Sequence, residues 1–282
     1  MASEVGIGPV GILGHGVVGG AIARHLAPVV TVHPWDPAMP RLGTREAALA
    51  CPVVFVAAPT PTGPDGEHAD CRCVEDAVRM VAAANPGARV VILSTVPMDL
   101  CDALSRVERL PVELYHQPEF LTERIAALDV AMAQRIVIGC GSTACAPDPV
   151  LEAVYRVGWP GAELRWVPWE TSALLKYGLN AFGAVKVALC NELAQVAEAV
   201  GVRWWELREL MLGDGRVGRE WTLVPGPDGE LGFGGACLPK DTRALAAQAE
   251  ALGVRPLVMR AALAKSAEVR GAQGRPWPRG SV

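Results

Sequence analysis

Residues 9–26 read PVGILGHGVVGGAIARHL, a short apolar run followed by the motif Gly14-x-Gly16-x-x-Gly19 and then by a helical pattern. In a strand, turn and helix of this kind, the first glycine makes the tight turn and the second lets the backbone approach a pyrophosphate. The third allows the helix to pack closely on the strand, and the phosphates lie at the helix amino terminus. The segment therefore predicts a dinucleotide site in the first βα unit of the chain.

An acidic residue lies where a side chain that binds the ribose of a dinucleotide is expected. Asp36 comes 22 positions after Gly14 and follows the second apolar run. A carboxylate at this place accepts a hydrogen bond from a ribose 2′-hydroxyl and repels a 2′-phosphate, so it favours NAD over NADP. The alternative is that Asp36 only shapes a turn, because it lies in the sequence Trp35-Asp36-Pro37.

The first half of the chain alternates short apolar runs with helical patterns, which is typical of a parallel sheet covered by helices. We therefore expect an α/β fold, with a Rossmann-like, doubly wound domain over residues 1–165. The expected strands are Pro9–Leu13, Val29–His33, Val53–Ala57, Arg89–Leu93, Val112–Tyr115 and Arg135–Ile138, and the expected helices are Val17–Ala27, Ala69–Ala84 and Asp99–Val107.

The second half predicts an all-helical domain over residues 166–270. Apolar residues recur every three or four positions from 170 to 200, which indicates one long helix. About 30 residues at 1.5 Å each give roughly 45 Å, more than a small domain needs, so this helix is expected at a domain or subunit interface. Further helical patterns begin near Trp204 and Pro239, and residues 271–282 are expected to be a frayed tail.

Composition narrows the class of protein. The 282 residues suffice for about two domains. The chain has 26 Lys and Arg against 30 Asp and Glu, a net charge of −4 without a basic cluster, so nucleic acid is not an expected partner. The first basic residue is Arg24, and no long uninterrupted apolar run occurs, so we expect neither a signal peptide nor a membrane span and place the protein in the cytoplasm. None of the eight cysteines forms a CxxC pair; most are expected to be reduced, and no metal site is expected.

Lys176 and Asn180 are four residues apart on the long helix, so both project from one face. An ammonium and an amide donor aimed at one point can stabilise an oxyanion. The alternative is a solvated helix lysine, but the apolar neighbours of Lys176 favour a buried, functional one.

Cys237 follows a glycine-rich loop and enters a helix that carries Lys240 and Asp241. A helix amino terminus and a nearby cation both favour the nucleophilic thiolate. A merely structural cysteine is the alternative. Beside NAD, a thiolate can trap an aldehyde as a thiohemiacetal, whose further oxidation gives a thioester and, with water, a carboxylate. Such a reaction consumes two NAD for each primary alcohol.

Several further segments follow the glycine-rich motif: Ala57-Ala-Pro-Thr-Pro61, Ser94-Thr-Val-Pro97, Pro118-Glu-Phe-Leu-Thr-Glu123, Lys176-x-x-x-Asn180 and Gly232-Phe-Gly-Gly-Ala-Cys-Leu-Pro-Lys-Asp241. In this order and spacing they resemble the UDP-glucose/GDP-mannose dehydrogenase family. The resemblance extends from Gly11 to about Gly253. It implies an NAD-dependent, four-electron oxidation of a primary alcohol to a carboxylate, on a nucleotide sugar, nucleoside or related sugar derivative.

The resemblance also implies residue roles. Cys237 is expected to be the nucleophile, Lys176 and Asn180 the oxyanion donors, Asp241 the residue that orients or activates water, Thr95 a residue near that water, and Glu119 a general acid or base. The expected NAD-binding residues are Gly14, Gly16, Val17, Val18, Gly19, Asp36, Pro59, Thr60, Thr95, Glu123 and Lys240. The expected substrate residues are Glu119, Phe120, Leu121, Lys176, Asn180, Arg216, Phe233 and Gly234, with Arg216 reaching the substrate of a neighbouring subunit in a homodimer.

Two departures from the family pattern affect these expectations. The resemblance implies a third, nucleotide-sugar-binding domain, which we expect to be missing here, and Arg124 stands where the family usually has glycine after the second glutamate. The composition suggests a bacterial source, for which a role in secondary-metabolite biosynthesis would suit a shortened family member. Two alternatives stay open: a two-electron dehydrogenase of the β-hydroxyacid type, and a non-catalytic paralogue that binds NAD.

Overall fold

The structure is a computed structural model that describes residues 7–141 and 145–271. The predicted tail, apart from Gly271, lies outside the described residues. The chain divides into two compact units. The first comprises Met1–Pro61 with Asp70–Lys176, and the second comprises Thr62–Ala69 with Tyr177–Val282. This division differs from the expected domain boundary at residue 165. The long helix up to Lys176 belongs to the unit that contains the sheet, and the loop Thr62–Ala69 belongs to the helical unit.

The first unit is built on a seven-stranded sheet with the order β2-β1-β3-β4-β5-β6-β7. Neighbouring strands are parallel except β5 and β6, which pair antiparallel, so the predicted parallel sheet is correct for all but one pairing. The second strand begins three residues later than expected, and the seventh was not predicted. The strands are β1 Val10–Leu13, β2 Val32–Trp35, β3 Val53–Val56, β4 Arg89–Ile92, β5 Glu113–His116, β6 Arg135–Cys140 and β7 Glu163–Pro168.

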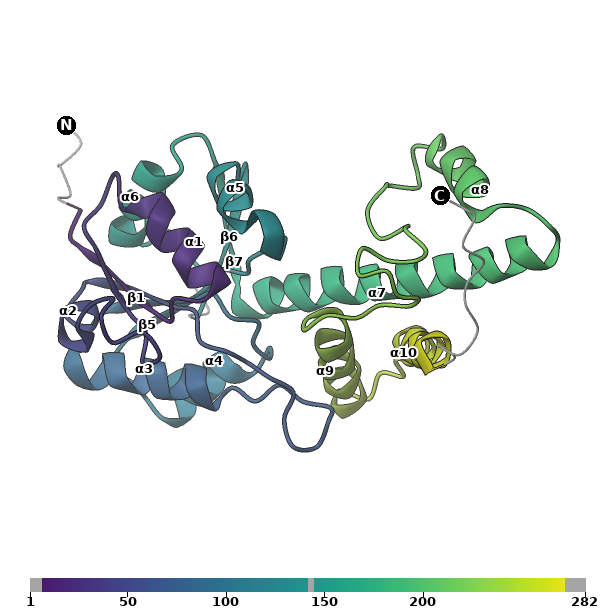
Figure 1. Cartoon of the computed structure of the whole chain (residues 1–282). Helices are drawn as coiled ribbons and strands as arrows, with labels where there is room; N and C mark the ends of the chain where they lie inside the picture. Colours follow the sequence, from purple (N-terminus) through teal and green to yellow (C-terminus); the bar gives the residue numbers. More distant parts are fainter. Residues whose placement is uncertain (1–6, 142–144, 272–282) are drawn as a thin grey trace. The chain divides into compact units, whose positions relative to one another are not determined.

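Helices cover both faces of this sheet, with α1, α5 and α6 on one side and α2, α3 and α4 on the other (Figure 1). This explains why every residue of β1 and β3 is buried, as expected for strands with both faces covered. The predicted helix at 99–107 is a short α-helix continued by a π-helical segment, Ala103–Val107. The helices are α1 Val17–Leu26, α2 Arg45–Leu49, α3 Arg72–Ala84, α4 Leu100–Asp102, α5 Ala126–Ala131 and α6 Pro149–Gly158; of these, α2, α5 and α6 were not predicted.

The second unit is helical, as predicted. Helix α7, Trp169–Ala199, carries residues of both units and agrees with the predicted 170–200 helix within a residue. It is followed by α8 Trp204–Leu212, α9 Leu238–Ala251 and α10 Leu257–Gly271. Within this unit Arg260 of α10 holds the loop 62–69, because its guanidinium pairs with Glu67 at 2.7 Å as well as with Glu250 at 2.8 Å.

Among the described residues, α7 alone is long and apolar enough to cross a membrane by length and composition. In its most apolar window 44% of the residues are buried inside the protein, and core helices of globular proteins meet the same criterion. Large apolar side chains on α7 are nevertheless exposed, including Phe182 at 63% and Val196 at 60%.

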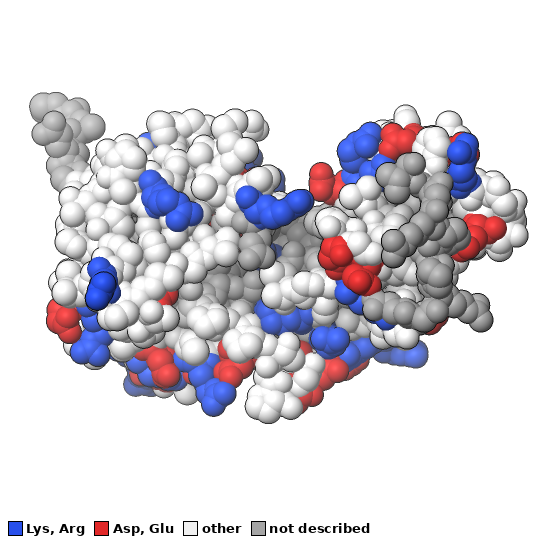
Figure 2. Space-filling view, viewed as in Figure 1, with Lys and Arg blue, Asp and Glu red and all other residues white. Residues whose placement is uncertain are grey.

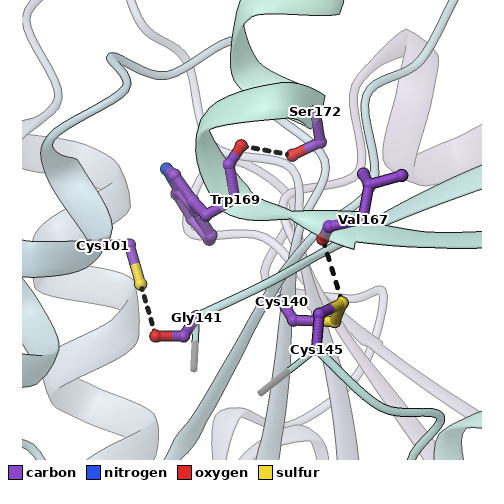
Figure 3. The surroundings of a disulfide bond; sticks show 7 residues. All are labelled: Cys101, Cys140, Gly141, Cys145, Val167, Trp169 and Ser172. Carbon is purple, nitrogen blue, oxygen red and sulfur yellow. Dashed lines mark hydrogen bonds between the residues drawn. A yellow bond between two sulfur atoms is a disulfide. The ribbon is translucent and has the colours of Figure 1, made fainter. Parts of the chain in front are cut away.

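One cysteine pair departs from the expectation that most cysteines are reduced. Cys140, the last residue of β6, and Cys145 form a disulfide with a Cα–Cα distance of 5.3 Å (Figure 3). The sulfur of Cys145 lies 3.1 Å from the carbonyl oxygen of Val167, and the Cys101 thiol lies 3.6 Å from the carbonyl of Gly141. The remaining cysteines carry thiols: Cys51, Cys71, Cys73, Cys101, Cys190 and Cys237.

Reduction of this disulfide is expected to lower the free energy of unfolding by only about 2 kcal/mol, because the bridge closes a loop with a sequence separation of 5. Urea unfolding with and without reductant measures the difference. Thiol titration in denaturant should give six groups before reduction and eight after it. Eight thiols in protein purified without reductant would contradict the pairing, and Cys145→Ser should reproduce the stability of the reduced protein.

Candidate functional site

The glycine-rich turn after β1 has the shape that a bound pyrophosphate needs. Gly14 has φ +90°, and a Cβ there would lie 2.5 Å from the carbonyl oxygen of Ala57. A Cβ on Gly19 would lie 2.0 Å from the carbonyl oxygen of Gly14, so any side chain would push α1 away from the strand. A Cβ on Gly16 would meet nothing within 4 Å, which leaves its backbone open at the start of α1. The roles predicted for the three glycines agree with this geometry.

Asp36 lies at the end of β2, beside the same turn. Its Oδ2 accepts a hydrogen bond from the backbone N–H of His15 at 2.7 Å, and its Oδ1 accepts one from the N–H of Ala38 at 2.8 Å. The residue therefore shapes its own turn and also anchors the glycine-rich turn. These contacts confirm that Asp36 shapes a turn, and the ribose contact stays a prediction, because carboxylate oxygens can accept further hydrogen bonds.

The loops that follow β3 and β4 lie at the edge of the sheet where the glycine-rich turn also lies, because these strands are parallel neighbours. Ser94 Oγ joins the two loops by donating to the carbonyl of Ala58 at 2.6 Å. Thr60 and Thr95 are half-buried in these loops and Pro59 is exposed. The three predicted NAD contacts in these loops thus share one sheet edge with Gly14.

A groove of about 520 Å³ runs beside the first turn of α1, lined by Gly16 and Val17 on one side and residues 124–128 on the other. Two arginines line it, Arg24 and Arg124, and neither forms an ion pair with another described residue. Both arginines therefore place positive charge beside the start of α1. The face drawn in Figure 2 shows scattered basic residues among acidic and uncharged ones rather than a continuous basic patch.

Glu119 follows β5 and receives contacts from two directions. The amide of Gln117 donates to Glu119 Oε1, and the Lys176 ammonium donates to the backbone carbonyl of Glu119. Burial raises the pKa of the Glu119 carboxyl to about 8, against the lowering influence of Lys176 and Gln117. A carboxyl group with a pKa near neutrality can exchange a proton with a substrate, as a general acid or base must.

The neighbours of Glu119 line a cavity of about 220 Å³ in the first unit, which includes Phe120 and Leu121. Lys176 Nζ lies 5.5 Å from the centre of the Phe120 ring, which is 42% exposed. A cation over an aromatic face is held there by the ring quadrupole. Glu123 begins a single 3-10 turn, Glu123–Ile125, and its side chain lies outside the described set.

The second unit holds a separate buried polar cluster around Asp241, which is 1% exposed. Asp241 Oδ2 accepts a hydrogen bond from the amide of Asn180 at 2.5 Å, and Oδ1 pairs with Lys240 Nζ at 2.5 Å. The side chain of Lys240 is 13% exposed. Asp241 therefore fixes the amide of Asn180 on α7, and the predicted NAD contact Lys240 serves first as the partner of Asp241.

Cys237 lies at the amino end of α9 and is exposed, as a nucleophile must be. The loop before it is fixed within the second unit. Ser266 Oγ of α10 accepts from the N–H of Phe233 at 3.0 Å, and a Cβ on Gly234 would lie 2.4 Å from the guanidinium of Arg270. The side chain of Phe233, predicted to contact substrate, is 4% exposed and packs in the core with Ala184 and Val187.

Arg216 is exposed and pairs with Asp214 at 2.6 Å, in a shallow groove with Leu210, Met211 and Val217. The paired arginine lowers the pKa of Asp214 to about 2.

The structure brings together Lys176 with Glu119 in the first unit, and Asn180 with Lys240 and Asp241 in the second. Sequence reasoning missed Gln117 and His116, the latter fully buried with Nδ1 2.8 Å from Ser172 Oγ. Burial lowers the pKa of His116 to about 3, so its ring is neutral.

Several curated proteins are similar to this chain in sequence. The chain is 37% identical over 213 residues to UDP-glucose 6-dehydrogenase of Rhizobium meliloti, which covers 73% of this chain and 48% of the relative. It is 31% identical over 232 residues to UDP-glucose 6-dehydrogenase of Pseudomonas aeruginosa, a match that covers 79% of this chain and 50% of the relative. The chain thus spans about half the length of these curated relatives.

Solved structures agree on the fold. A UDP-glucose dehydrogenase from the hyperthermophilic archaeon Pyrobaculum islandicum matches with a TM-score of 0.82 and 29% identity, covering 95% of this chain and 70% of that one. A 3-hydroxyisobutyrate dehydrogenase of Mycobacterium tuberculosis matches with a TM-score of 0.68 at 20% identity, which shows a shared fold and covers 95% of that chain.

Two family models account for most of the chain. One describes the NAD-binding domain of the UDP-glucose/GDP-mannose dehydrogenases and matches residues 41–158. The other describes the central domain of the same proteins and matches residues 170–267. The family's NAD-binding and helical domains thus coincide with the Rossmann-like and helical parts described above, and the chain belongs to the UDP-glucose/GDP-mannose dehydrogenase family.

Proposed function

We propose that the chain catalyses an NAD-dependent, four-electron oxidation of a primary alcohol to a carboxylate, on a nucleotide sugar or a related sugar derivative. The observation that carries the proposal is the cluster of Asn180, Lys240 and Asp241 next to an exposed Cys237 at the start of α9. The names of the relatives, UDP-glucose 6-dehydrogenase, support the substrate class.

The residues at the glycine-rich turn fit NAD. The open backbone at Gly16 and the missing side chains at Gly14 and Gly19 form a cradle that a Cβ would fill. Asp36 stands beside that cradle with a carboxylate for a ribose. The other residues proposed to hold the dinucleotide are Val17, Val18, Pro59, Thr60, Thr95, Glu123 and Lys240. When bound, NAD accepts the hydride that leaves the substrate carbon in each oxidation.

The chemistry on the protein side begins with the substrate hydroxyl. In its carboxylate form Glu119 accepts the hydroxyl proton while the carbon loses a hydride, which gives an aldehyde. The Cys237 thiolate then adds to the carbonyl carbon to form a thiohemiacetal, and loss of a second hydride leaves a thioester. Water attacks the thioester carbonyl, which releases the carboxylate and restores the Cys237 thiol. Asp241 and Thr95 are the residues proposed to orient this water.

Two donors are proposed for the charge that develops on the substrate oxygen. Lys176 and Asn180 lie one turn apart on α7, and each is held by a neighbour: Lys176 at the carbonyl of Glu119 and Asn180 at Asp241. Donors that are already oriented stabilise an oxyanion without reorganising during the reaction. Phe120, Leu121, Arg216, Phe233 and Gly234 remain the residues proposed to contact the rest of the substrate.

The proposed assembly is a cytoplasmic homodimer with α7 at its interface, acting in a biosynthetic pathway. The exposed apolar side chains along this helix support it, because a single chain leaves Phe182, Leu189 and Val196 at 51% exposure or more. Arg216 is then the residue proposed to reach the neighbouring subunit's substrate.

The stoichiometry of the reaction tests the proposal. Incubation of the chain with UDP-glucose and excess NAD should yield two NADH and one uronate for each sugar consumed, measured by absorbance and mass spectrometry. Omission of NAD gives the blank. One NADH per turnover with an aldehyde or ketone product would instead favour the two-electron β-hydroxyacid type. NAD binding without turnover on any nucleotide sugar would favour a non-catalytic paralogue.

A further inference from the structure

A buried hydrogen-bond chain ends on the carboxyl group of Glu119. Tyr155 of α6 donates its hydroxyl to Gln117 Oε1 at 2.5 Å, and Gln117 Nε2 donates to Glu119 Oε1. Tyr155 is 0% exposed and Gln117 is 4% exposed, so water does not compete for either contact. A buried polar group without a hydrogen-bond partner costs free energy of folding. The members of this hydrogen-bond chain therefore stay paired and keep fixed orientations.

The direction of each hydrogen bond in the chain is fixed by chemistry. Burial, and then the charge of Glu119, raise the pKa of Tyr155 well above 10, so its hydroxyl keeps its proton and donates. The amide oxygen of Gln117 therefore faces the tyrosine, and its NH₂ group faces Glu119. Because Oε1 of Glu119 accepts this bond, the proton of the neutral acid lies on Oε2.

The tyrosine itself is immobilised by the core of the first unit. Its ring meets Phe55 of β3 edge-on at 6.3 Å and lies 5.8 Å from the ring of Trp159. The indole N–H of Trp159 in turn donates to the carbonyl of Val130 at 2.7 Å. Packed aromatic rings fix the position of the hydroxyl oxygen, and its hydrogen bond to Oε1 then holds the Gln117 amide in one orientation.

We propose that Gln117 and Tyr155 are positioning residues that select Oε2 of Glu119 as its proton-transferring oxygen and favour the ionised form of the carboxyl group. The proposal rests on the function proposed for Glu119. The other charged groups near it are Lys176 of α7, which lowers the pKa of Glu119, and Asp129 and Arg135, which line the same cavity. Because donation from Gln117 also lowers this pKa, removal of either positioning residue should raise it.

The test compares Tyr155→Phe and Gln117→Met with a matched control, Tyr115→Phe. Tyr115 is a buried tyrosine on β5 that takes no part in this series of hydrogen bonds and packs edge-on against Trp166. The pKa of Glu119 is measured without substrate by infrared titration of its carboxyl band, which is identified by its loss in Glu119→Gln. The expected result is an upward shift of about one pH unit in both variants and none in the control.

Activity gives the second measurement. If the carboxylate is the active form, the ascending limb of kcat/KM should move up by the same amount, so that activity at pH 7 falls about tenfold and recovers at higher pH. A merely structural defect would not be rescued by pH. An unshifted infrared titration in folded Tyr155→Phe and Gln117→Met would overturn the proposal. Undiminished activity of Glu119→Gln would overturn the role of Glu119, whereas the infrared shift would still report the hydrogen-bond chain.

Discussion

Replacement of Cys237 by serine is expected to lower carboxylate formation by at least about 10³-fold, because the hydroxyl that replaces the thiol is a far weaker nucleophile near neutral pH. The first oxidation does not need the sulfur, so aldehyde or its hydrate should be the trapped product. The NAD dissociation constant should be unchanged, since Cys237 is not among the residues proposed to hold the dinucleotide. Product analysis by mass spectrometry and NAD titration by fluorescence measure the two effects.

The chain offers a matched control for this variant. Cys73 on α3 is also exposed and carries a thiol, but it belongs to no cluster that the proposed reaction uses. Cys73→Ser should retain full activity and the two-NADH stoichiometry. Full-rate carboxylate formation by Cys237→Ser would remove the thioester route, and equal losses in both variants would indicate general damage to the protein instead.

The fold was largely predictable because its decisive elements depend on local chemistry. Gly14 and Gly19 are required by contacts of 2.5 Å or less that a Cβ would make, and such positions are visible in a sequence. The buried strands appear as apolar runs for the same reason. The strand β7 was missed because its residues Glu163 and Arg165 are charged, and the antiparallel pairing of β6 depends on tertiary arrangement that no local pattern records.

The site was predictable only in its residue types. The four-residue spacing of Lys176 and Asn180 follows from helix geometry, but their partners do not. The Asn180 amide meets Asp241 from a helix 61 positions later, and Tyr155 meets Gln117 across 38 positions. The resemblance implied a contact between Phe233 and substrate, but no motif could show that its side chain is 4% exposed and packs in the core of the second unit. The Cys140–Cys145 disulfide was missed because a four-residue gap between two cysteines has no characteristic pattern.

Replacement of Asp241 by alanine is expected to have the largest effect on stability, lowering the free energy of unfolding by about 3–5 kcal/mol. The side chain is 1% exposed, and its loss leaves the Lys240 ammonium, at 13% exposure, without its partner. Asn180 loses its acceptor at the same time. Urea unfolding followed by circular dichroism measures the change, and the loss should be concentrated in the second unit, where all three residues lie.

Two further variants separate the buried charge from simple truncation. Glu206→Ala removes the acidic half of an exposed pair with Arg203, whose side chains are 40% and 59% exposed, and should cost no more than about 1 kcal/mol. Asp241→Asn with Lys240→Met removes both charges but keeps an oxygen for Asn180, so it should recover much of the stability lost in Asp241→Ala. A double variant no more stable than Asp241→Ala would show that packing, rather than the unpaired ammonium, governs this cluster. Recovery of stability without recovery of activity would instead separate the structural role of Asp241 from its proposed role in orienting water.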